Sequence, residues 1–389
     1  MTTALFLFNH DAPHQVAHLA GTAAAFARLY PQHRTVIAYA TVPIRRAIER
    51  IAPAPDLAAV QWHELALPAW TRPVTTLDSL VPASRLLRLR NYADLFARAD
   101  AVISTERTCL KVKRFIHPRD MPMFIRIPHG AGDRNVTYHP DYRQFDRILL
   151  AGEKAVQHMT AVGVARDRLR IVGYPKFDAV DRSPRPRLFG NDRPTFVYNP
   201  HFDPHLSSWY DAGPALLEWF ASSEGQDYNC VFAPHVMLFR KRLHISPEYR
   251  TARLRPDVPA SAMRADNIVV DLDGPRLFDM TYTLGADAYI GDASSQLYEF
   301  LLRPRPVFLL DPRGALASEG EASLPFLAAG RRIAGVDGLV QAIRASRDLH
   351  NDFAQAQQTL FDHTFSVTDT PAPERAAAAI AEALASARG

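Results

Sequence analysis

The chain of 389 residues has only two cysteines, Cys109 and Cys230. Neither belongs to a CxxC pair or stands beside histidines at zinc-ligand spacing, so the sequence predicts no disulfide framework and no metal site of that kind. No stretch approaches the roughly 18 continuous apolar residues that span a bilayer. The apolar run within residues 1–8 is too short for a signal peptide. We therefore expect a cytoplasmic protein.

A strong excess of one charge sign is also missing. The chain has 45 basic and 41 acidic residues and a formal net charge of +4. The basic residues are mostly arginines scattered along the chain, without the interleaved aromatics of a nucleic-acid surface. The composition argues against nucleic acid as a partner and leaves room for a small anionic ligand.

The patterns that are present favour two α/β domains. A chain of 389 residues exceeds what one hydrophobic core usually supports. Short β-branched or aromatic runs alternate with longer segments of helical period, which predicts βαβ units and parallel sheets. We expect two Rossmann-like, doubly wound lobes with a cleft between them.

A change in composition sets the expected domain boundary. Residues 181–194 are rich in Pro, Arg, Asp, Ser, Gly and Asn, a mixture typical of a linker. This places an N-terminal lobe at 1–180 and a C-terminal lobe at 195–370. Residues 371–389 would form a C-terminal helix that packs across the lobe boundary.

The expected elements alternate in both lobes. In the first lobe the strands are 4–8, 35–40, 101–104, 123–127, 147–151 and 169–172, and the helices 14–29, 44–51, 84–99 and 153–162. In the second lobe the strands are 195–198, 229–233, 268–271, 288–290 and 306–309, and the helices 214–221, 275–284, 294–302, 336–346 and 374–387.

The sharpest functional signal is a strand that turns on small polar residues and opens a helix. The turn carries Asp292, Ser294, Ser295 and Gln296. Backbone N–H groups at a helix start, together with serine hydroxyls, suit a phosphate or pyrophosphate. The same residues are also those of an ordinary helix cap.

Two histidines follow predicted strands. His129 and Gly130 stand in a glycine-containing loop, where a histidine of near-neutral pKa suits general-base work on a hydroxyl. His235 ends a buried strand of the second lobe and would contact phosphate, where a protonated imidazole stabilises a departing diphosphate. Either histidine could instead be satisfied by neighbouring carbonyls.

Three further residues are candidates for the same ligand. Pro200 and His201 end another strand of the second lobe, and Lys176 lies in a turn before the linker. Lys176 could meet phosphate or be a solvated surface lysine. His201 and His205 invite a metal interpretation, but no set of carboxylates and histidines has the close spacing of a dedicated site, so we expect no metal.

In this order and at these intervals, the motifs resemble the CDP-glycerol glycerophosphotransferase family, the polymerases and primases of teichoic-acid-like polymers. The segments that carry the resemblance are PHG at 128–130, GYPKFD at 173–178, YNP at 198–200, APH at 233–235 and DASSQLYEFLLRPRPV at 292–307. They span most of the chain from about residue 120 to 310.

The resemblance implies a GT-B arrangement and a transferase that needs no metal and no cofactor. Its substrate would be a CDP-linked donor bound by the C-terminal lobe, and its acceptor a hydroxyl of a surface polymer or lipid-linked primer. It further implies that His129 is the base, that His235 lies near the donor phosphates, and that Ser294 and Ser295 hold the pyrophosphate. The enzyme would work at the inner face of the cell membrane.

Two departures from the family pattern keep other functions open. The His-Gly loop continues with Ala131 and Gly132 where the family commonly has Thr and Pro, and Ala233 replaces a usual basic residue. A GT-B glycosyltransferase, a UDP-sugar 2-epimerase or a non-catalytic nucleotide-binding protein would fit as alternatives. For membrane contact, the helix 84–99 offers four arginines around an apolar stripe, although a core-facing helix explains this pattern equally well.

Overall fold

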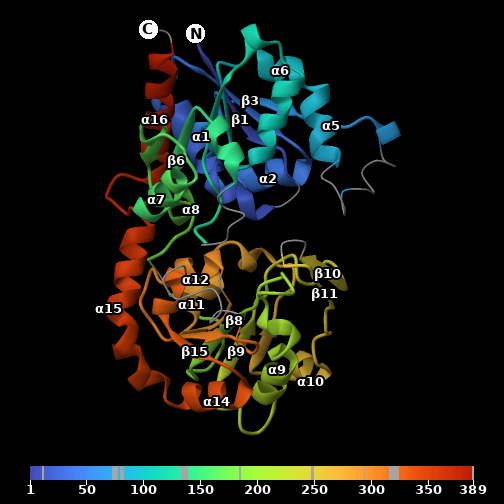
Figure 1. Ribbon diagram of the computed structural model, residues 1–389, viewed down its shortest axis with the longest axis vertical. Helices are drawn as coiled ribbons and strands as arrows, with labels where there is room; N and C mark the ends of the chain where they lie inside the picture. Colours follow the sequence, from blue (N-terminus) through green and yellow to red (C-terminus); the bar gives the residue numbers. More distant parts are fainter. Residues whose placement is uncertain are drawn as a thin grey trace. The chain divides into compact units, whose positions relative to one another are not determined.

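The structure is a computed structural model that describes residues 1–10, 13–71, 78, 83–132, 139–183, 185–246, 249–292, 294–314 and 324–387. The chain divides into two compact units. Unit 1 comprises residues 1–130, 135–181 and 363–389, and unit 2 comprises residues 131–134 and 182–362. Each unit is built around its own parallel sheet (Figure 1).

Unit 1 contains a seven-stranded sheet of order β3-β2-β1-β4-β5-β6-β7, in which every pairing is parallel. Its inner strands are continuous apolar runs, as expected for strands with helices on both faces. The strands are β1 (Thr3–Phe8), β2 (Arg34–Tyr39), β3 (Gln61–Glu64), β4 (Ala101–Ser104), β5 (Met123–Arg126), β6 (Arg147–Leu150) and β7 (Leu169–Ile171).

Two hydrophobic cores cover the two faces of this sheet. One contains Phe6, Phe26 and Ile37, and the other contains Leu89 and Phe96. The helices of unit 1 are α1 (Ala20–Leu29), α2 (Val42–Ile51), α3 (Ala54–Leu57), α5 (Ala83–Asn91), α6 (Ala93–Ala97), α7 (Glu153–Ala161), α8 (Pro175–Asp178) and α16 (Ala372–Ser386).

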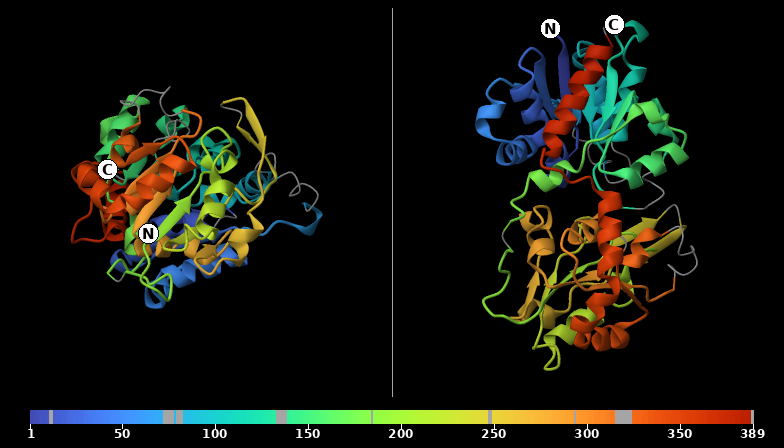
Figure 2. Two further views of the ribbon diagram at one scale, coloured as in Figure 1. Left: turned by 90° about the horizontal axis from the view of Figure 1, so that it is seen from below. Right: turned by 90° about the vertical axis from the view of Figure 1, so that its left-hand side faces the viewer.

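The C-terminal helix α16 belongs to unit 1, although the chain reaches it only after completing unit 2. It packs on α1 (Figure 2). Ala376, Ile380 and Leu384 recur at intervals of four, share one face of the helix, and are buried in the first core. The helix α15 (Ser346–Thr364) precedes it.

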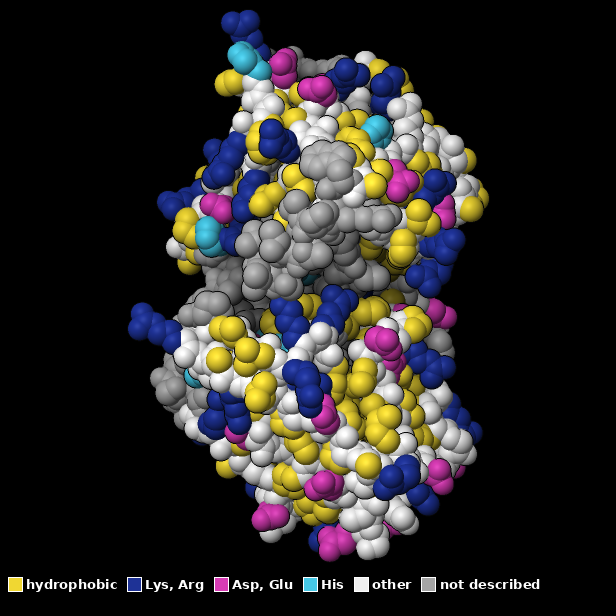
Figure 3. Space-filling model, turned by 90° about the vertical axis from the view of Figure 1, so that its right-hand side faces the viewer, with side chains coloured by type: hydrophobic (Ala, Val, Ile, Leu, Met, Phe, Trp, Pro, Cys, Tyr) yellow, Lys and Arg dark blue, Asp and Glu magenta, His cyan; other side chains and the backbone are white. Residues whose placement is uncertain are grey.

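Unit 2 contains a six-stranded sheet of order β12-β9-β8-β13-β14-β15, again parallel throughout. A two-stranded antiparallel hairpin, β10–β11, lies outside this sheet, on the face of unit 2 that Figure 3 displays. The strands are β8 (Thr195–Asn199), β9 (Asn229–Phe232), β10 (Leu243–Ser246), β11 (Thr251–Leu254), β12 (Ile268–Val270), β13 (Ala288–Gly291), β14 (Val307–Leu310) and β15 (Arg331–Ile333).

The core of unit 2 is aromatic. Trp209 and Phe232 stack with ring centroids 4.6 Å apart, and Phe196 and Phe220 pack nearby. The helices are α9 (Gly213–Ala221), α10 (Ala260–Arg264), α11 (Thr281–Gly285), α12 (Ser295–Phe300) and α14 (Val336–Arg344).

The predicted α/β class with two parallel sheets is confirmed, and so are the predicted strands to within one or two residues at their ends. Several elements differ. The expected helix 84–99 is two helices with a break at Tyr92, and the expected helix 275–284 is a 3-10 turn followed by α11. The strands β3, β10, β11 and β15 and the helix α15 were not expected. β3 and β15 carry exposed polar residues, which hide the apolar pattern of a buried strand.

Both cysteines are buried and free, which agrees with the expected lack of a disulfide framework. Within the described part of the chain, no helix has the length and apolar character needed to cross a membrane.

Candidate active site

The order of the sheet in unit 2 singles out one edge. The chain runs from β8 to β9 and β12 on one side of the sheet, and from β13 to β14 and β15 on the other. The boundary between β8 and β13 is therefore a topological switch point, and ligands of open parallel sheets bind outside the carboxyl ends of the strands at such points. Asn199 ends β8 beside Gly291, so the switch point carries Asn199 and Asp292.

A hydroxyl network joins the two strand ends. The Asn199 Oδ1 atom accepts hydrogen bonds from the hydroxyls of Tyr289 and Ser294, each at 3.2 Å. Ser294 is also the N-cap of α12, because its Oγ accepts from the backbone N–H of Leu297 at 3.4 Å. Ser294 is thus a helix cap, one of the two roles that the sequence left open for it. Its bond to Asn199 also fixes it at the switch point.

Asp292 is buried beneath this network, with 1% of its surface exposed. Its Oδ2 atom accepts from the backbone N–H groups of His201 at 2.7 Å and Ser208 at 3.0 Å. Its Oδ1 atom has no hydrogen-bond partner among the described residues. Burial raises the pKa of this carboxyl to about 7, although the two N–H bonds act in the opposite direction. Asp292 thus anchors the loop 200–208 and exchanges its proton near neutral pH.

Two imidazoles stand side by side at the ends of β8 and β9. The rings of His201 and His235 have centroids 5.3 Å apart. The Nδ1 of His201 accepts from the Asp203 N–H at 2.9 Å, and the Nδ1 of His235 accepts from the Met237 N–H at 3.2 Å. A neutral imidazole whose Nδ1 is an acceptor carries its proton on Nε2. Both rings are therefore N–H donors at Nε2, which suits phosphate oxygens.

Pro200 fixes this pair of strand ends, since its carbonyl accepts from the backbone N–H of His235 at 3.0 Å. Ser295 and Gln296 are the first residues of α12. The Oγ of Ser295 accepts from the backbone N–H of Ala131 at 3.3 Å, and Ala131 groups with unit 2. The Gln296 amide donates to the Leu277 carbonyl at 3.3 Å, which ties it to the preceding turn. Ala293, within the same motif, lies outside the described residues.

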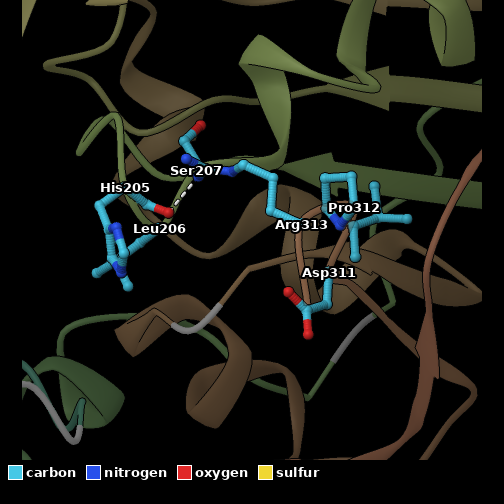
Figure 4. Close-up of a pocket in the computed structure, with 7 residues that line it drawn as sticks. His205, Leu206, Ser207, Asp311, Pro312 and Arg313 are labelled. Carbon is cyan, nitrogen blue, oxygen red and sulfur yellow. Dashed lines mark hydrogen bonds between the residues drawn. The ribbon is translucent and has the colours of Figure 1, made fainter. Parts of the chain in front are cut away.

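A cation that the sequence did not single out lies at the end of β14. A small pocket there is lined by His205, Leu206 and Ser207 and by Leu310 and residues 311–313 (Figure 4). The Arg313 guanidinium donates to the His205 carbonyl and pairs with Asp211 at 3.2 Å. Its positive charge also lowers the pKa of Asp292, a smaller effect than burial. Arg313 therefore brings positive charge to the same edge of the sheet.

His129 follows β5 in unit 1. Its Nδ1 lies 3.3 Å from the Thr105 carbonyl, which places a proton on Nδ1 and leaves Nε2 as the basic nitrogen. Removal from water and, next, the positive charge of Arg126 lower the pKa of His129 to about 4. This imidazole is neutral at physiological pH, but its pKa lies well below the near-neutral value that was expected from the sequence for a general base.

Gly130 and Lys176 also lie in unit 1. Gly130 has a φ of 98°, a left-handed conformation that favours glycine, so the His-Gly loop depends on it. Lys176 is in α8 and only 6% exposed, so it is not the solvated surface lysine that the sequence left open. The predicted site residues of unit 2 are Pro200, His201, His235, Asp292, Ser294, Ser295 and Gln296.

The arginine-rich segment 84–99 packs part of its apolar stripe against the core of unit 1. Leu89 and Phe96 of its apolar stripe are buried in the core of unit 1. Arg88 is buried as well, and Arg85 pairs with Glu106 at 2.8 Å. The core-facing interpretation of this helix holds.

Sequence reasoning missed Asn199, Tyr289 and Arg313. Asn199 was visible as the polar residue that ends a strand of apolar residues. Arg313 was visible as a charged residue three positions after the apolar strand β14. Tyr289 lies inside β13 and gave no such signal, because an aromatic residue in a buried strand reads as core. Among the described residues, no group of His, Cys, Asp or Glu is placed to hold a metal ion.

Comparison with solved structures finds proteins of similar fold. The structure is similar to that of the wall teichoic acid polymerase TagF, in a variant soaked with CDP-glycerol, with a TM-score of 0.63 and 13% identity over 100% of this chain and 90% of that one. The fold is GT-B-like. The resemblance drawn from the motifs is thus confirmed at the level of fold.

Two other solved structures share this GT-B-like fold. The S. aureus protein MnaA, solved with UDP, has a TM-score of 0.60 and 13% identity over 99% of this chain and 97% of that one. A Listeria monocytogenes protein assigned as a UDP-N-acetylglucosamine 2-epimerase has a TM-score of 0.59 and 13% identity over 99% of this chain and 96% of that one. No family model matches the sequence, and no curated protein matches it.

Proposed function

We propose that this protein is a transferase that moves glycerol phosphate, or a related polyol or sugar phosphate, from a CDP-linked donor to a hydroxyl acceptor. The acceptor would be the end of a surface polymer or a lipid-linked primer. The proposal joins the motif resemblance to the polar residues at the switch point of unit 2. It needs neither a metal nor a cofactor.

The observation that carries the proposal is the pair His201 and His235. Two Nε2–H donors from neighbouring strands, on rings 5.3 Å apart, would donate to the oxygens of a diphosphate. Arg313 adds a positive charge at the same sheet edge. The N–H groups and hydroxyls at Ser294 and Ser295 would complete the phosphate contacts. The Asp292 carboxylate would repel an anionic phosphate, so its role is to position the loop 200–208 through its bonds to the His201 and Ser208 N–H groups.

The proposed reaction is a phosphoryl-group displacement. The acceptor hydroxyl oxygen attacks the phosphorus that bears the polyol, and a new P–O bond forms. The bond from this phosphorus to the bridging oxygen breaks, and CMP departs with that oxygen. The Nε2 of His129 takes the hydroxyl proton, while His235 stabilises the charge that develops on CMP.

The neutral state of His129 supports its role as the base. Its Nδ1–H bond to the Thr105 carbonyl orients the ring and directs proton uptake to Nε2. Lys176 is a further candidate for phosphate contact.

Product analysis tests the proposal. The purified protein is incubated with CDP-glycerol and a glycerol-phosphate acceptor, and the released nucleotide is separated by chromatography. Release of CMP, lost in His235→Ala, is the expected result. A matched control is His244→Ala. His244 also lies in unit 2, and its Nε2 lies 2.9 Å from the Leu238 carbonyl oxygen.

A second candidate is a UDP-sugar enzyme, which the similarity to MnaA with UDP and to the assigned 2-epimerase favours. Release of UDP from a UDP-sugar, or inversion of the sugar at C2, would establish that candidate and contradict ours. A melting-temperature shift with CDP conjugates but no turnover would identify a non-catalytic binding protein, because a ligand that binds only the native state raises the melting point.

A further inference from the structure

The hairpin β10–β11 has one face that the protein leaves uncovered. Leu243 pairs with Leu254 and Ile245 with Ala252 in the antiparallel register, so these four side chains lie on one face. Leu243 is 49% exposed, Ile245 64% and Leu254 73%. An aliphatic surface of this kind is unusual on a two-stranded hairpin, whose outer face is normally polar.

Basic side chains surround this apolar face. The segment 240–257 carries six basic and two acidic residues, a net charge of +4 that equals the formal charge of the whole chain. Within this segment Arg242 pairs with Asp257, and Arg253 pairs with Asp211 outside it. Arg240, Lys241, Arg242 and Arg250 are exposed at the two ends of the hairpin. Hydrophobic side chains with Lys and Arg beside them are visible on this face in Figure 3.

The inner face of the hairpin is bonded to the candidate site. The Ser246 hydroxyl donates to Asp203 Oδ2 at 2.9 Å, and the Asp203 N–H donates to Nδ1 of His201. Arg253 makes two bonds to the Asp211 carboxylate, at 2.7 and 2.8 Å. The hairpin is thus a fixed part of unit 2, and its inner face is bonded to the loop that holds His201.

We propose that the outer face of β10–β11 docks unit 2 on an anionic lipid surface, with the aliphatic side chains in the headgroup boundary and the basic side chains on the lipid phosphates. Exposed aliphatic residues flanked by Lys and Arg are the combination that binds such surfaces. The inference rests on the proposed function only in that a lipid-linked acceptor would then be presented to the loop holding His201.

Charge and size argue against a second copy of this chain as the occupant. A two-fold symmetric contact would place the same basic rim against itself, and like charges repel. Four side chains also supply much less than the roughly 800 Å² per partner of a stable interface. Anionic lipid offers the complementary charge that a second copy lacks.

Vesicle sedimentation tests this surface without any nucleotide, so its outcome is separate from that of the activity assay. The protein is mixed with vesicles of phosphatidylcholine containing 30% phosphatidylglycerol, or of phosphatidylcholine alone, at low and high salt. We expect binding to the anionic vesicles that weakens at high salt. The double variant Arg240→Gln with Lys241→Gln should bind about 25-fold more weakly, about fivefold for each charge removed.

Matched controls separate the surface from general charge and hydrophobicity. Arg331→Gln with Arg332→Gln removes the same charge from the exposed part of β15 and should bind like the wild type. Ile245→Ser with Leu254→Ser should lose binding, whereas Met263→Ser, also exposed, should keep it. Circular dichroism verifies folding of each variant.

Three results would overturn the inference. They are failure of the wild type to bind anionic vesicles, equal weakening by the β15 and hairpin charge variants, and a concentration-dependent dimer in analytical ultracentrifugation that Ile245→Ser with Leu254→Ser abolishes. The last of these would make the hairpin an interface between copies of the chain.

Discussion

His129 is the residue whose surroundings bear most directly on the proposed chemistry. Its pKa of about 4 lies below the ordinary value near 6.5, because burial and then the charge of Arg126 disfavour the imidazolium. A base with this pKa stays unprotonated well below neutral pH. The acid limb of the rate profile should therefore fall near pH 4 to 5 rather than near 6.5.

Replacing His129 should remove catalysis and spare binding. We expect His129→Ala to lower kcat by roughly 10²- to 10⁴-fold, the usual contribution of a general base, with little change in the Kd of CDP-glycerol. The initial rate of CMP release measures kcat, and isothermal titration calorimetry measures the Kd of CDP-glycerol. Wild-type turnover by the variant would contradict the assignment.

Ser295 offers a cleaner test of phosphate binding than Ser294, because Ser294 also caps α12. We expect Ser295→Ala to weaken CDP-glycerol binding by roughly 1 to 3 kcal/mol, the value of one hydrogen bond to a charged group. Isothermal titration measures the affinity, and Ser222→Ala, at the end of α9, is the control. An unchanged Kd would argue against the serine turn as the pyrophosphate site.

Asp292 makes stability depend on pH in the opposite direction from an ordinary carboxylate. Its folded pKa of about 7 lies above the unfolded value of 3.8, so its contribution is complete at low pH and is lost as pH rises through 7. Asp292→Asn does not titrate. Between pH 5 and 8 we expect the melting temperature of the wild type to fall by a few degrees relative to that of Asp292→Asn. Asp337→Asn, an exposed control, should follow the wild type.

At the scale of elements, the sequence predicted what local pattern determines. The strands β8, β9, β13 and β14 are runs of apolar residues bounded by polar ones, and both their positions and the polar residues that end them were readable. The side-by-side position of His201 and His235 depends on strand order, which no local pattern contains. In β10 and β11 the apolar residues are the exposed ones and the less exposed residues are polar, so the usual signal of a half-buried strand, with its apolar residues inward, was reversed.

Gly173 lies against the segment that leads into α16, so a substitution at Gly173 tests how tightly that segment packs on unit 1. Gly173 has a φ of 87°, and a Cβ there would lie 2.8 Å from the Ser366 carbonyl oxygen. We expect Gly173→Ala to destabilise unit 1 by about 1 to 3 kcal/mol, from backbone strain and the displaced segment. Urea unfolding followed by circular dichroism measures the change. Gly190→Ala is the control, because its Cβ would meet nothing within 4 Å.

For the whole molecule, two separate sheets and cores predict separable unfolding. Ile380 is fully buried in the core of unit 1, so Ile380→Ala should cost about 2 to 4 kcal/mol in that unit. CDP-glycerol should instead stabilise unit 2. Scanning calorimetry should show the variant lowering one transition and the ligand raising the other. A single transition that both perturbations shift equally would contradict this separation.

The late return of the chain to unit 1 also governs the order of events at the ribosome. Unit 2 is almost continuous in sequence, from residue 182 to 362, whereas the core of unit 1 needs Ile380 and Leu384 from α16. The domain that is started first therefore cannot close its core until the last of these residues has left the exit tunnel. Nascent unit 1 must persist in an incomplete state throughout synthesis of unit 2, which makes it the part of this protein that most needs a chaperone.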